Sequence, residues 1–367
     1  MMNDAAWMCA AYREAVRAVG STHPNPPVGC VIVRDGVVVG RGHTQPPPGP
    51  HAEVTSLEQA GRLARGATAY VSLEPCNHHG RTPPCASALI EAGISRVVAG
   101  VRDPNPLASG GFDSLQKAGV GTAVLDPGGR AAALLAPFLH WARTGRPYVL
   151  LKAAMTLDGK TASASGESRW ITSSVARAYV HRLRARFGAV MVGVETALID
   201  DPLLTVRHEH SSLEARSQPA RIVMDSHLRL PVESRLVASA ASSPLIAACG
   251  ETASAERENR LREAGVVVLR VPERDGKPDF AILLAELGMR GVTGIVLEGG
   301  GELAFTALRD GCVNEVLYFI APTLMGGRDA HTPIGGAGFA SPAVSARLSD
   351  ITIRRCGRDF VFRGFVR

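Results

Sequence analysis

The feature that most constrains this chain is a set of metal-ligand residues divided between two distant motifs. His51 and Glu53 belong to HAE at 51–53, Cys76 closes EPC at 74–76, and Cys85 follows. One imidazole and two thiolates are good zinc ligands, and three protein ligands leave the fourth position open for water, as in catalytic zinc sites. The fold must therefore bring these segments to one point.

The same residues match a catalytic signature. Zinc deaminases carry H-x-E followed by P-C-x-x-C, and this chain departs from that pattern only by having the eight residues NHHGRTPP between Cys76 and Cys85. Two prolines and a glycine exclude regular helix there and predict a loop that returns Cys85 to the metal. Zinc lowers the pKa of bound water to about 7, so we expect Glu53 to carry the water proton to a ring nitrogen and then to the leaving ammonia.

The remaining cysteines and the loop histidines have simpler interpretations. Seven cysteines, an odd and scattered set, do not form a disulfide framework. His78 and His79 are alternative ligands, but in a Gly/Pro loop we favour substrate contacts or exposed side chains. Core packing is expected for the cysteines outside the motif, which are Cys9, Cys30, Cys249, Cys312 and Cys356.

Composition limits the class of protein. A chain of 367 residues exceeds the usual ~100–200 per domain, which predicts two domains. The net charge of +6 comes without a dense basic run, and aromatic residues make up only 5%, so we expect phosphate-bearing small substrates and no nucleic acid. The first residues lack a secretory signal and charges interrupt every apolar run, which predicts a cytoplasmic protein with no membrane partner.

Hydrophobic periodicity in the first half predicts a sheet with helices on both faces. RDG at 34–36 lies between two valine-rich runs and predicts a hairpin, hence an antiparallel pair. DPGGR and TGRPY flank a short apolar helix, and we interpret 126–147 as a linker. The predicted strands are 28–33, 37–39, 69–73, 96–101 and 120–124, and the predicted helices are 4–19, 52–64, 85–92 and 111–118.

The second half has the same α/β character with an antiparallel edge. ITIRRCG and DFVFRGFV near the C-terminus predict a closing hairpin. Strands are predicted at 148–154, 189–193, 221–225, 244–248, 266–270, 293–298 and 315–320, and helices at 173–187, 255–263, 279–288 and 301–309.

Two helix starts in the second half are candidate anion sites. ITSS supplies Thr172 or Ser173 as an N-cap, where free backbone N–H groups favour an anion. In LEGGGELAFTAL at 297–308 a strand ends in Glu298, glycines allow close backbone approach, and a helix begins. The pattern is not G-x-G-x-x-G, so a standard dinucleotide-binding unit is not supported. From spacing alone, plain turn glycines explain it equally well.

Longer segments carry a family resemblance. HPNPPVGCVIV (23–33), GRGHTQPPPGPHAE (40–53), LEPCNHHGRTPPC (73–85) and GVRDPNP (100–106) closely resemble the bifunctional riboflavin-biosynthesis deaminase–reductases, whose HHGRTPPC fills the insertion that other zinc deaminases lack. LKAAMTLDGK, GESRWIT, VGVETALIDDPLLTVR (192–207) and LEGGG resemble the reductase domain of the same family, in order. The resemblance implies a cytidine-deaminase-like three-layer α/β/α domain at 1–146 and a dihydrofolate-reductase-like α/β domain at 147–367.

The resemblance also implies two reactions and a homodimer formed through the second domain. The first reaction is zinc-dependent deamination of 2,5-diamino-6-ribosylamino-4(3H)-pyrimidinone 5′-phosphate. The second uses NADPH to reduce the ribosyl side chain and gives 5-amino-6-(5-phospho-D-ribitylamino)uracil. The resemblance also implies that the first substrate is contacted by Asn25, His43, Arg81, Asp103 and Asn105. Asn25 and Asn105 each precede a proline, so turn initiation explains them equally well.

For the reductase, the resemblance implies substrate contacts at Ser168, Arg184, Leu204, Arg207 and Glu298, the two arginines being suited to bidentate capture of the 5′-phosphate. Lys152 and Asp200 are the ionisable groups for which we expect a catalytic role. A salt bridge at a strand end is the alternative for Lys152, and core packing is the alternative for Trp170. The implied NADPH contacts are Ala154, Trp170, Thr196, Asp200, Ser226, Gly300, Gly301, Glu302, Leu303, Ala304, Phe305 and Thr306.

Two other functions share part of these features. A tRNA- or nucleoside-editing deaminase has the same zinc motif and explains the basic charge, but it leaves residues 148–367 unexplained. A structural zinc module fused to a nucleotide-sensing domain requires a fourth protein ligand, and Glu53 in H-x-E argues against it.

Overall fold

The computed structural model describes residues 3–78, 83–207 and 218–367. The chain forms two compact units, residues 1–145 and 146–367. No helix in the described ranges is both long and apolar enough to cross a membrane.

The first unit is built on a five-stranded sheet of order β2-β1-β3-β4-β5. Strand β1 is antiparallel to β2 and β3, whereas β3, β4 and β5 are parallel. Asp35 (φ 51°) and Gly36 (φ 77°) connect β1 to β2, and positive φ at both positions is typical of a two-residue hairpin turn. The predicted hairpin is confirmed. The strands are β1 Gly29–Arg34, β2 Val37–His43, β3 Thr68–Leu73, β4 Arg96–Val101 and β5 Gly121–Val124.

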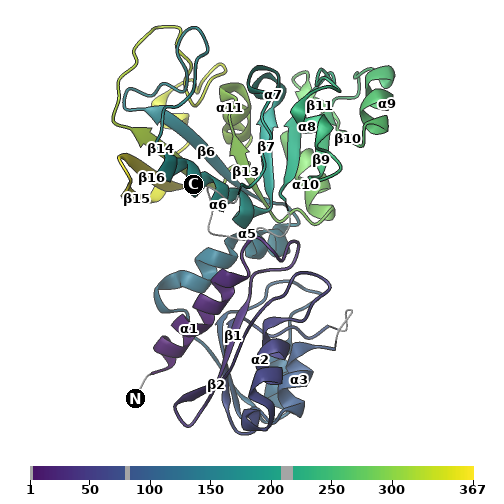
Figure 1. Cartoon of the computed structure of the whole chain (residues 1–367), viewed down its shortest axis with the longest axis vertical. Helices are drawn as coiled ribbons and strands as arrows, with labels where there is room; N and C mark the ends of the chain where they lie inside the picture. The colour runs from purple at the N-terminus through teal and green to yellow at the C-terminus, as the bar shows by residue number, and fades with distance from the viewer. Residues whose placement is uncertain (1–2, 79–82, 208–217) are drawn as a thin grey trace. The chain divides into compact units, whose positions relative to one another are not determined.

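Helices cover both faces of this sheet, as the alternation along β1 requires. Val31 packs with α1 on one face, while Cys30 and Ile32 pack with α2 and its neighbours on the other. Figure 1 shows α1 and α2 on opposite sides of β1. The predicted three-layer α/β/α arrangement is confirmed. The helices are α1 Asp4–Arg17, α2 Ala52–Ala60, α3 Cys85–Glu91, α4 Gly111–Lys117 and α5 Arg130–Thr144, with short 3₁₀ turns η1 Gly61–Ala64 and η2 Pro127–Gly129.

Helix α5 occupies most of the segment interpreted as a linker. Leu135, Phe138 and Leu139 on this helix belong to the hydrophobic core of the first unit. Its apolar face is therefore packed rather than exposed, and α5 is an integral part of that unit.

The second unit contains a nine-stranded sheet of order β10-β9-β8-β7-β13-β6-β14-β16-β15. In this spatial order, the seven strands β10, β9, β8, β7, β13, β6 and β14 are parallel. The C-terminal hairpin β15–β16 adds an antiparallel edge, as predicted. The strands are β6 Tyr148–Thr156, β7 Ala189–Gly193, β8 Ala220–Met224, β9 Leu245–Cys249, β10 Val267–Arg270, β13 Gly294–Glu298, β14 Glu315–Ala321, β15 Leu348–Cys356 and β16 Asp359–Val366; β11 Glu273–Arg274 and β12 Lys277–Pro278 pair separately.

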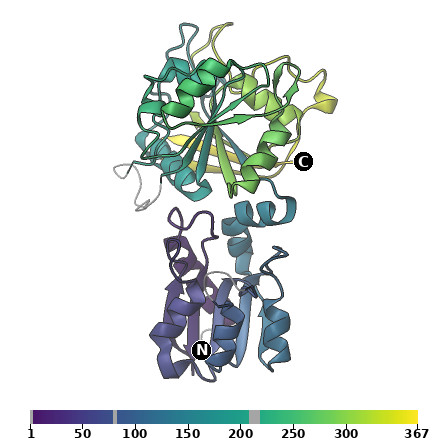
Figure 2. The same ribbon diagram turned by 90° about the vertical axis from the view of Figure 1, so that its right-hand side faces the viewer.

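Helices lie on both sides of the second sheet (Figure 2). On β7, Met191 packs in one apolar cluster while Val190 and Val192 pack in the other, so the strand is buried on both faces. The helices are α6 Ser174–Phe187, α7 Val194–Asp200, α8 Arg235–Ala238, α9 Ala255–Glu263, α10 Phe280–Met289 and α11 Gly301–Arg309, with the 3₁₀ turn η4 Pro342–Val344; α7 and α8 were not predicted.

Candidate active sites

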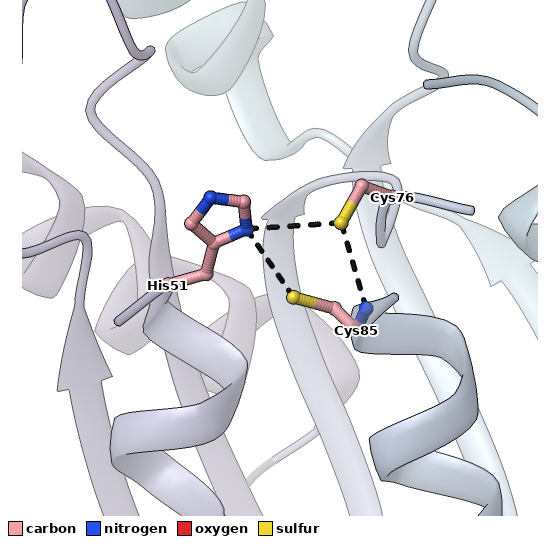
Figure 3. A group of neighbouring side chains, drawn as sticks. All are labelled: His51, Cys76 and Cys85. Atoms are coloured by element: carbon pink, nitrogen blue, oxygen red, sulfur yellow. Dashed lines mark hydrogen bonds between the residues drawn. The ribbon is translucent and has the colours of Figure 1, made fainter. Parts of the chain in front are cut away.

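The three predicted zinc ligands converge at the starts of two helices (Figure 3). His51 is the N-cap residue of α2, and Cys85 is the first residue of α3. His51 Nδ1 lies 3.7 Å from Cys76 Sγ and 3.3 Å from Cys85 Sγ. Cys76 follows β3 by three residues, so the eight-residue insertion ends where α3 begins.

These distances fit a zinc ion. With Zn–S and Zn–N bonds of about 2.3 and 2.0 Å, tetrahedral angles place a sulfur about 3.5 Å from a nitrogen. The ligand atoms of the three residues all lie within 4.8 Å of one another. No fourth His, Cys, Asp or Glu joins this group within the described ranges, the described His78 is outside it, and His79 lies outside the described residues.

The thiols are prepared for a cation. A hydrogen bond from the Cys85 thiol lowers the pKa of Cys76 to about 4, with a further contribution from His51. The same interaction raises the pKa of Cys85. The Cys85 backbone N–H also points to Cys76 Sγ at 3.5 Å, at a helix N-terminus that favours negative charge. One thiolate is therefore stabilised by the chain itself, and a bound divalent cation favours ionisation of the second.

Glu53 lies in the first turn of α2 and is buried. Burial raises the pKa of its carboxyl to about 7, and the nearby Cys76 adds to the effect. A group with this pKa both accepts and releases protons near neutral pH, which is what general acid–base catalysis requires. The structure thus places a carboxyl that can exchange its proton near neutral pH beside the three ligands.

The loop after β4 carries two of the predicted substrate contacts. Asp103 is buried, and burial raises the pKa of its carboxyl to about 6. Its Oδ1 accepts the Asn105 backbone N–H at 2.9 Å. Asn105 Oδ1 in turn accepts the Leu107 N–H at 3.1 Å, so the turn-forming role of Asn105 is present in the structure.

The other predicted contacts of the first unit are less closely defined. His43 Nδ1 lies 3.8 Å from Oε2 of the buried Glu14. Asn25 lies in the loop before β1, where its backbone N–H donates to the Thr22 carbonyl at 2.7 Å, as a turn residue does. Arg81 lies outside the described residues.

In the second unit, the centre of the candidate site is a buried ion-pair cluster. Glu298 ends β13 and accepts hydrogen bonds from Arg184 Nε at 2.7 Å and Nη2 at 3.0 Å. Lys152 Nζ lies 3.8 Å from Glu298 Oε2, because the parallel register places the two residues side by side on β6 and β13. Although burial opposes it, the charges of Arg184 and Lys152 lower the pKa of Glu298 to about 2. Burial lowers the pKa of Lys152.

This cluster bears on two predictions. The ion pair that was the alternative interpretation of Lys152 is present. The Nε–Nη2 edge of Arg184 is occupied by a carboxylate of the chain, while its Nη1 donates to the Thr205 carbonyl at 3.0 Å. Capture of the substrate phosphate by Arg184 therefore stays a prediction, whereas Arg207 is exposed at the edge of the described residues.

One of the two candidate anion sites is contacted by an acidic side chain of the chain itself. Ser173 caps α6, as predicted, by accepting the Ala176 N–H. However, Asp359 Oδ2 accepts both the Ser173 backbone N–H at 2.8 Å and its hydroxyl at 2.6 Å. An acidic side chain from the C-terminal hairpin thus lies at this helix start, and ligand binding at 172–173 stays a prediction.

The other candidate anion site keeps the expected geometry. Helix α11 begins after Gly300 (φ 81°), and no side chain caps it. A Cβ at Gly299 (φ 75°) would lie 3.2 Å from the Thr196 side chain, which shows that the turn packs closely against α7. Both segments follow the carboxyl ends of neighbouring parallel strands, where α/β proteins bind their ligands.

The other predicted cofactor and substrate contacts follow the same strand ends. Trp170 is 65% exposed, which rules out core packing, and the Arg177 guanidinium lies 4.4 Å from its ring centre. Arg169 Nη2 donates to the backbone carbonyl of Asp200 at 2.9 Å and lies 3.9 Å from Oδ1 of the Asp200 carboxylate. The remaining positions are Ala154 on β6, Ser168 in the loop that follows it, Leu204 in the loop after α7 and Ser226 after β8.

The sequence reasoning missed two buried polar residues near these sites. Glu74 is 2% exposed and binds the loop that carries Asp103. His181 is 3% exposed, and its ring contacts Arg207 at 3.3 Å. Glu74 is part of EPC, so its position beside a ligand was a usable signal, whereas nothing local marks His181.

A His–Cys–Cys zinc site beside a buried glutamate, on a three-layer α/β/α fold, defines a zinc-dependent deaminase unit, here joined to a second α/β unit. Family models agree: the cytidine and deoxycytidylate deaminase zinc-binding region matches residues 1–101, and the RibD C-terminal domain matches residues 147–362. The riboflavin biosynthesis protein RibD of Escherichia coli (strain K12) is 44% identical and covers 98% of each chain, and that of Actinobacillus pleuropneumoniae is 42% identical over 98% of this chain and 94% of its own.

Solved structures give the same result. A structure of Acinetobacter baumannii RibD matches with a TM-score of 0.88 and 38% identity over 99% of each chain, and the deaminase/reductase of Thermotoga maritima matches with 0.83 and 30% over 99% of each. The chain belongs to the RibD family of riboflavin biosynthesis proteins. It is a bifunctional enzyme with a zinc-dependent deaminase unit of cytidine-deaminase-like fold and an NADPH-dependent reductase unit of dihydrofolate-reductase-like fold.

Proposed function

We propose that the first unit deaminates 2,5-diamino-6-ribosylamino-4(3H)-pyrimidinone 5′-phosphate and that the second reduces the product to 5-amino-6-(5-phospho-D-ribitylamino)uracil. The convergence of His51, Cys76 and Cys85 with Glu53 beside them carries the proposal for the first unit. The Thermotoga maritima relative is described as a diaminohydroxyphosphoribosylaminopyrimidine deaminase and 5-amino-6-(5-phosphoribosylamino)uracil reductase.

In the deaminase unit, His51, Cys76 and Cys85 hold the zinc, which when bound supplies a water of lowered pKa as the nucleophile. Glu53 delivers one proton to the ring nitrogen and then a second, taken from the hydroxyl group added to the ring carbon, to the departing amino group, so that ammonia leaves and the carbonyl forms. Asp103, Asn105, Asn25, His43 and Arg81 are the proposed substrate contacts. The elevated pKa of Asp103 supports its carboxyl as a hydrogen-bonding partner of the ring.

In the reductase unit, NADPH supplies the hydride for C1′ of the ribosyl chain. The α11 start at Gly300–Thr306 and the adjoining Thr196 are the proposed diphosphate cradle, because uncapped N–H groups favour an anion there. Lys152 is the proposed catalytic residue, and Glu298 orients it at 3.8 Å. The proposed substrate contacts are Ser168, Leu204 and Arg207. The proposed NADPH contacts are Ala154, Trp170, Asp200 and Ser226.

A homodimer through the second unit in the cytoplasm completes the proposal. Ile351, Ile353 and Phe360 on the C-terminal hairpin are 53%, 65% and 45% exposed. Ile353 and Phe360 point to the same side of the hairpin by its register, and an apolar patch on an edge hairpin is a common contact surface. Light scattering on the wild-type chain and on Ile353→Lys tests this: the variant should be monomeric.

The decisive experiment incubates the full chain with the diaminopyrimidinone substrate and NADPH and follows ammonia release and NADPH oxidation separately. Both are expected, and NADPH oxidation should wait for ammonia release. Oxidation of NADPH without ammonia release, or the reverse, would show that one unit is wrongly assigned.

A further inference from the structure

One buried acidic side chain of the deaminase unit has no role in the chemistry above. Glu74 pairs with the Arg102 guanidinium (Nε–Oε2 2.7 Å) and accepts backbone hydrogen bonds from Asp103 at 3.2 Å and Phe112 at 2.9 Å. All three donors lie in residues 102–112, which we call the Asp103 segment. A single carboxylate therefore binds both ends of this segment.

The same segment is docked on residues 74–77, which we call the Cys76 segment. The Asn77 N–H donates to the Ala108 carbonyl at 2.9 Å. A Cβ at Gly111 would lie only 1.8 Å from the Pro75 carbonyl oxygen, so the close approach of the two segments requires glycine. The Glu74 carboxylate is buried at this junction, and charge-assisted hydrogen bonds are stronger when water is excluded.

Each segment contributes one residue to the deaminase site. The Cys76 segment carries a metal ligand, and the Asp103 segment carries the buried carboxyl that we assign to the substrate. We propose that Glu74 is a positioning residue that fixes the Asp103 segment on the Cys76 segment and thereby sets the place of Asp103 relative to the metal. This inference rests on the proposed deaminase function.

The test is Glu74→Gln in the full-length chain. Glutamine keeps the shape of the side chain but turns one oxygen into an NH₂ donor, which then faces another donor of the Asp103 segment. We expect kcat/KM for ammonia release to fall at least about tenfold, the effect of losing one charge-assisted hydrogen bond. Zinc should stay at one equivalent, and NADPH oxidation with the deaminated substrate should be unchanged.

A double-mutant cycle separates positioning from a general structural role. If Glu74 acts through Asp103, Glu74→Gln should have little further effect on kcat/KM once Asp103→Asn is present, because coupled residues are not additive. Glu58→Gln, at an exposed position on α2, is the matched control and should behave as wild type. Should Glu74→Gln fold poorly, Arg102→Met removes one partner from the half-exposed side and is expected to give a smaller loss of the same kind.

Four results would overturn the inference: unchanged kcat/KM in Glu74→Gln, loss of zinc, parallel loss of both activities, or additivity with Asp103→Asn. A wild-type chain that releases no ammonia would instead refute the proposed function itself. The two failures are therefore distinguishable.

Discussion

The two active sites are assembled in opposite ways. In the deaminase unit, His51 and Cys85 stand at the starts of α2 and α3, and each brings its ligand atom to the metal from a helix end. In the reductase unit, Lys152, Arg184 and Glu298 come from β6, α6 and β13, and Arg184 and Glu298 are 114 positions apart in the chain. The first site depends on short motifs at helix starts, whereas the second depends on a sheet and a helix that bring together residues distant in the chain.

The two sites also differ in how their charged groups are stabilised. Two thiols and the Glu53 carboxyl lie together in the first site, where the chain itself stabilises one thiolate and a bound cation favours ionisation of the second. In the second site the chain itself supplies the cations, since Arg184 and Lys152 surround one carboxylate. The first site should therefore fail when its metal is lost, and the second when its internal geometry is disturbed.

Loss of a zinc ligand should have the largest effect. We expect Cys76→Ser to bind less than one equivalent of zinc and to lower ammonia release by about 10⁴-fold or more, since the metal contributes several kcal/mol to the transition state. NADPH oxidation with the deaminated substrate should persist. Metal analysis and the two separate assays check this, with Cys9→Ser, outside the motif, as the control. Full deaminase activity of Cys76→Ser without bound zinc would contradict the conclusion that the first site depends on its metal.

Removal of the proton carrier tests the first site without removing its metal. Glu53→Gln keeps the shape of the side chain but not its acid–base function, so we expect kcat for ammonia release to fall about 10³-fold. Zinc content should stay at one equivalent. Glu58→Gln on the same helix is the matched control. If Glu53→Gln deaminates as fast as wild type, another group carries the proton.

The difference between the sites also decides what the sequence could predict. RDG predicted the β1–β2 turn, and H-x-E with the two cysteines predicted the zinc ligands, because hairpins, caps and ligand motifs are local signals. The occupation of the α6 N-terminus by Asp359 was not predictable, since the partners are 186 positions apart. The Arg184–Glu298 pair was missed for the same reason: the sequence assigned both residues to substrate, and only the fold shows that they bind each other.

The pairing of Glu298 with two cations in the second site predicts a pH dependence of stability. The pKa of Glu298 falls from 4.5 to about 2 on folding, so its contribution is present above pH 4.5 and is lost as the pH falls toward 2. The shift corresponds to about 3 kcal/mol of the free energy of unfolding. Denaturant unfolding of the second unit between pH 5 and 2 should show this component in wild type and not in Glu298→Gln. Glu263→Gln, at an exposed position on α9, should retain the wild-type pH dependence. If the free energy of unfolding depends on pH equally in Glu298→Gln and wild type, the ion pairs of Glu298 do not contribute to stability.

A smaller effect separates geometry from charge. Arg184→Lys keeps the positive charge but loses the planar fork that holds both oxygens of Glu298 and the Thr205 carbonyl. We expect the free energy of unfolding to fall by about 1.5–3 kcal/mol, the range for hydrogen bonds to charged groups, with KM of the reductase step raised and deamination unchanged. Arg182→Lys on the same helix should leave all three as in wild type. If Arg184→Lys also behaves as wild type, the second site requires only the positive charge and not the geometry of the guanidinium. The proposed contrast between the two sites would then be wrong.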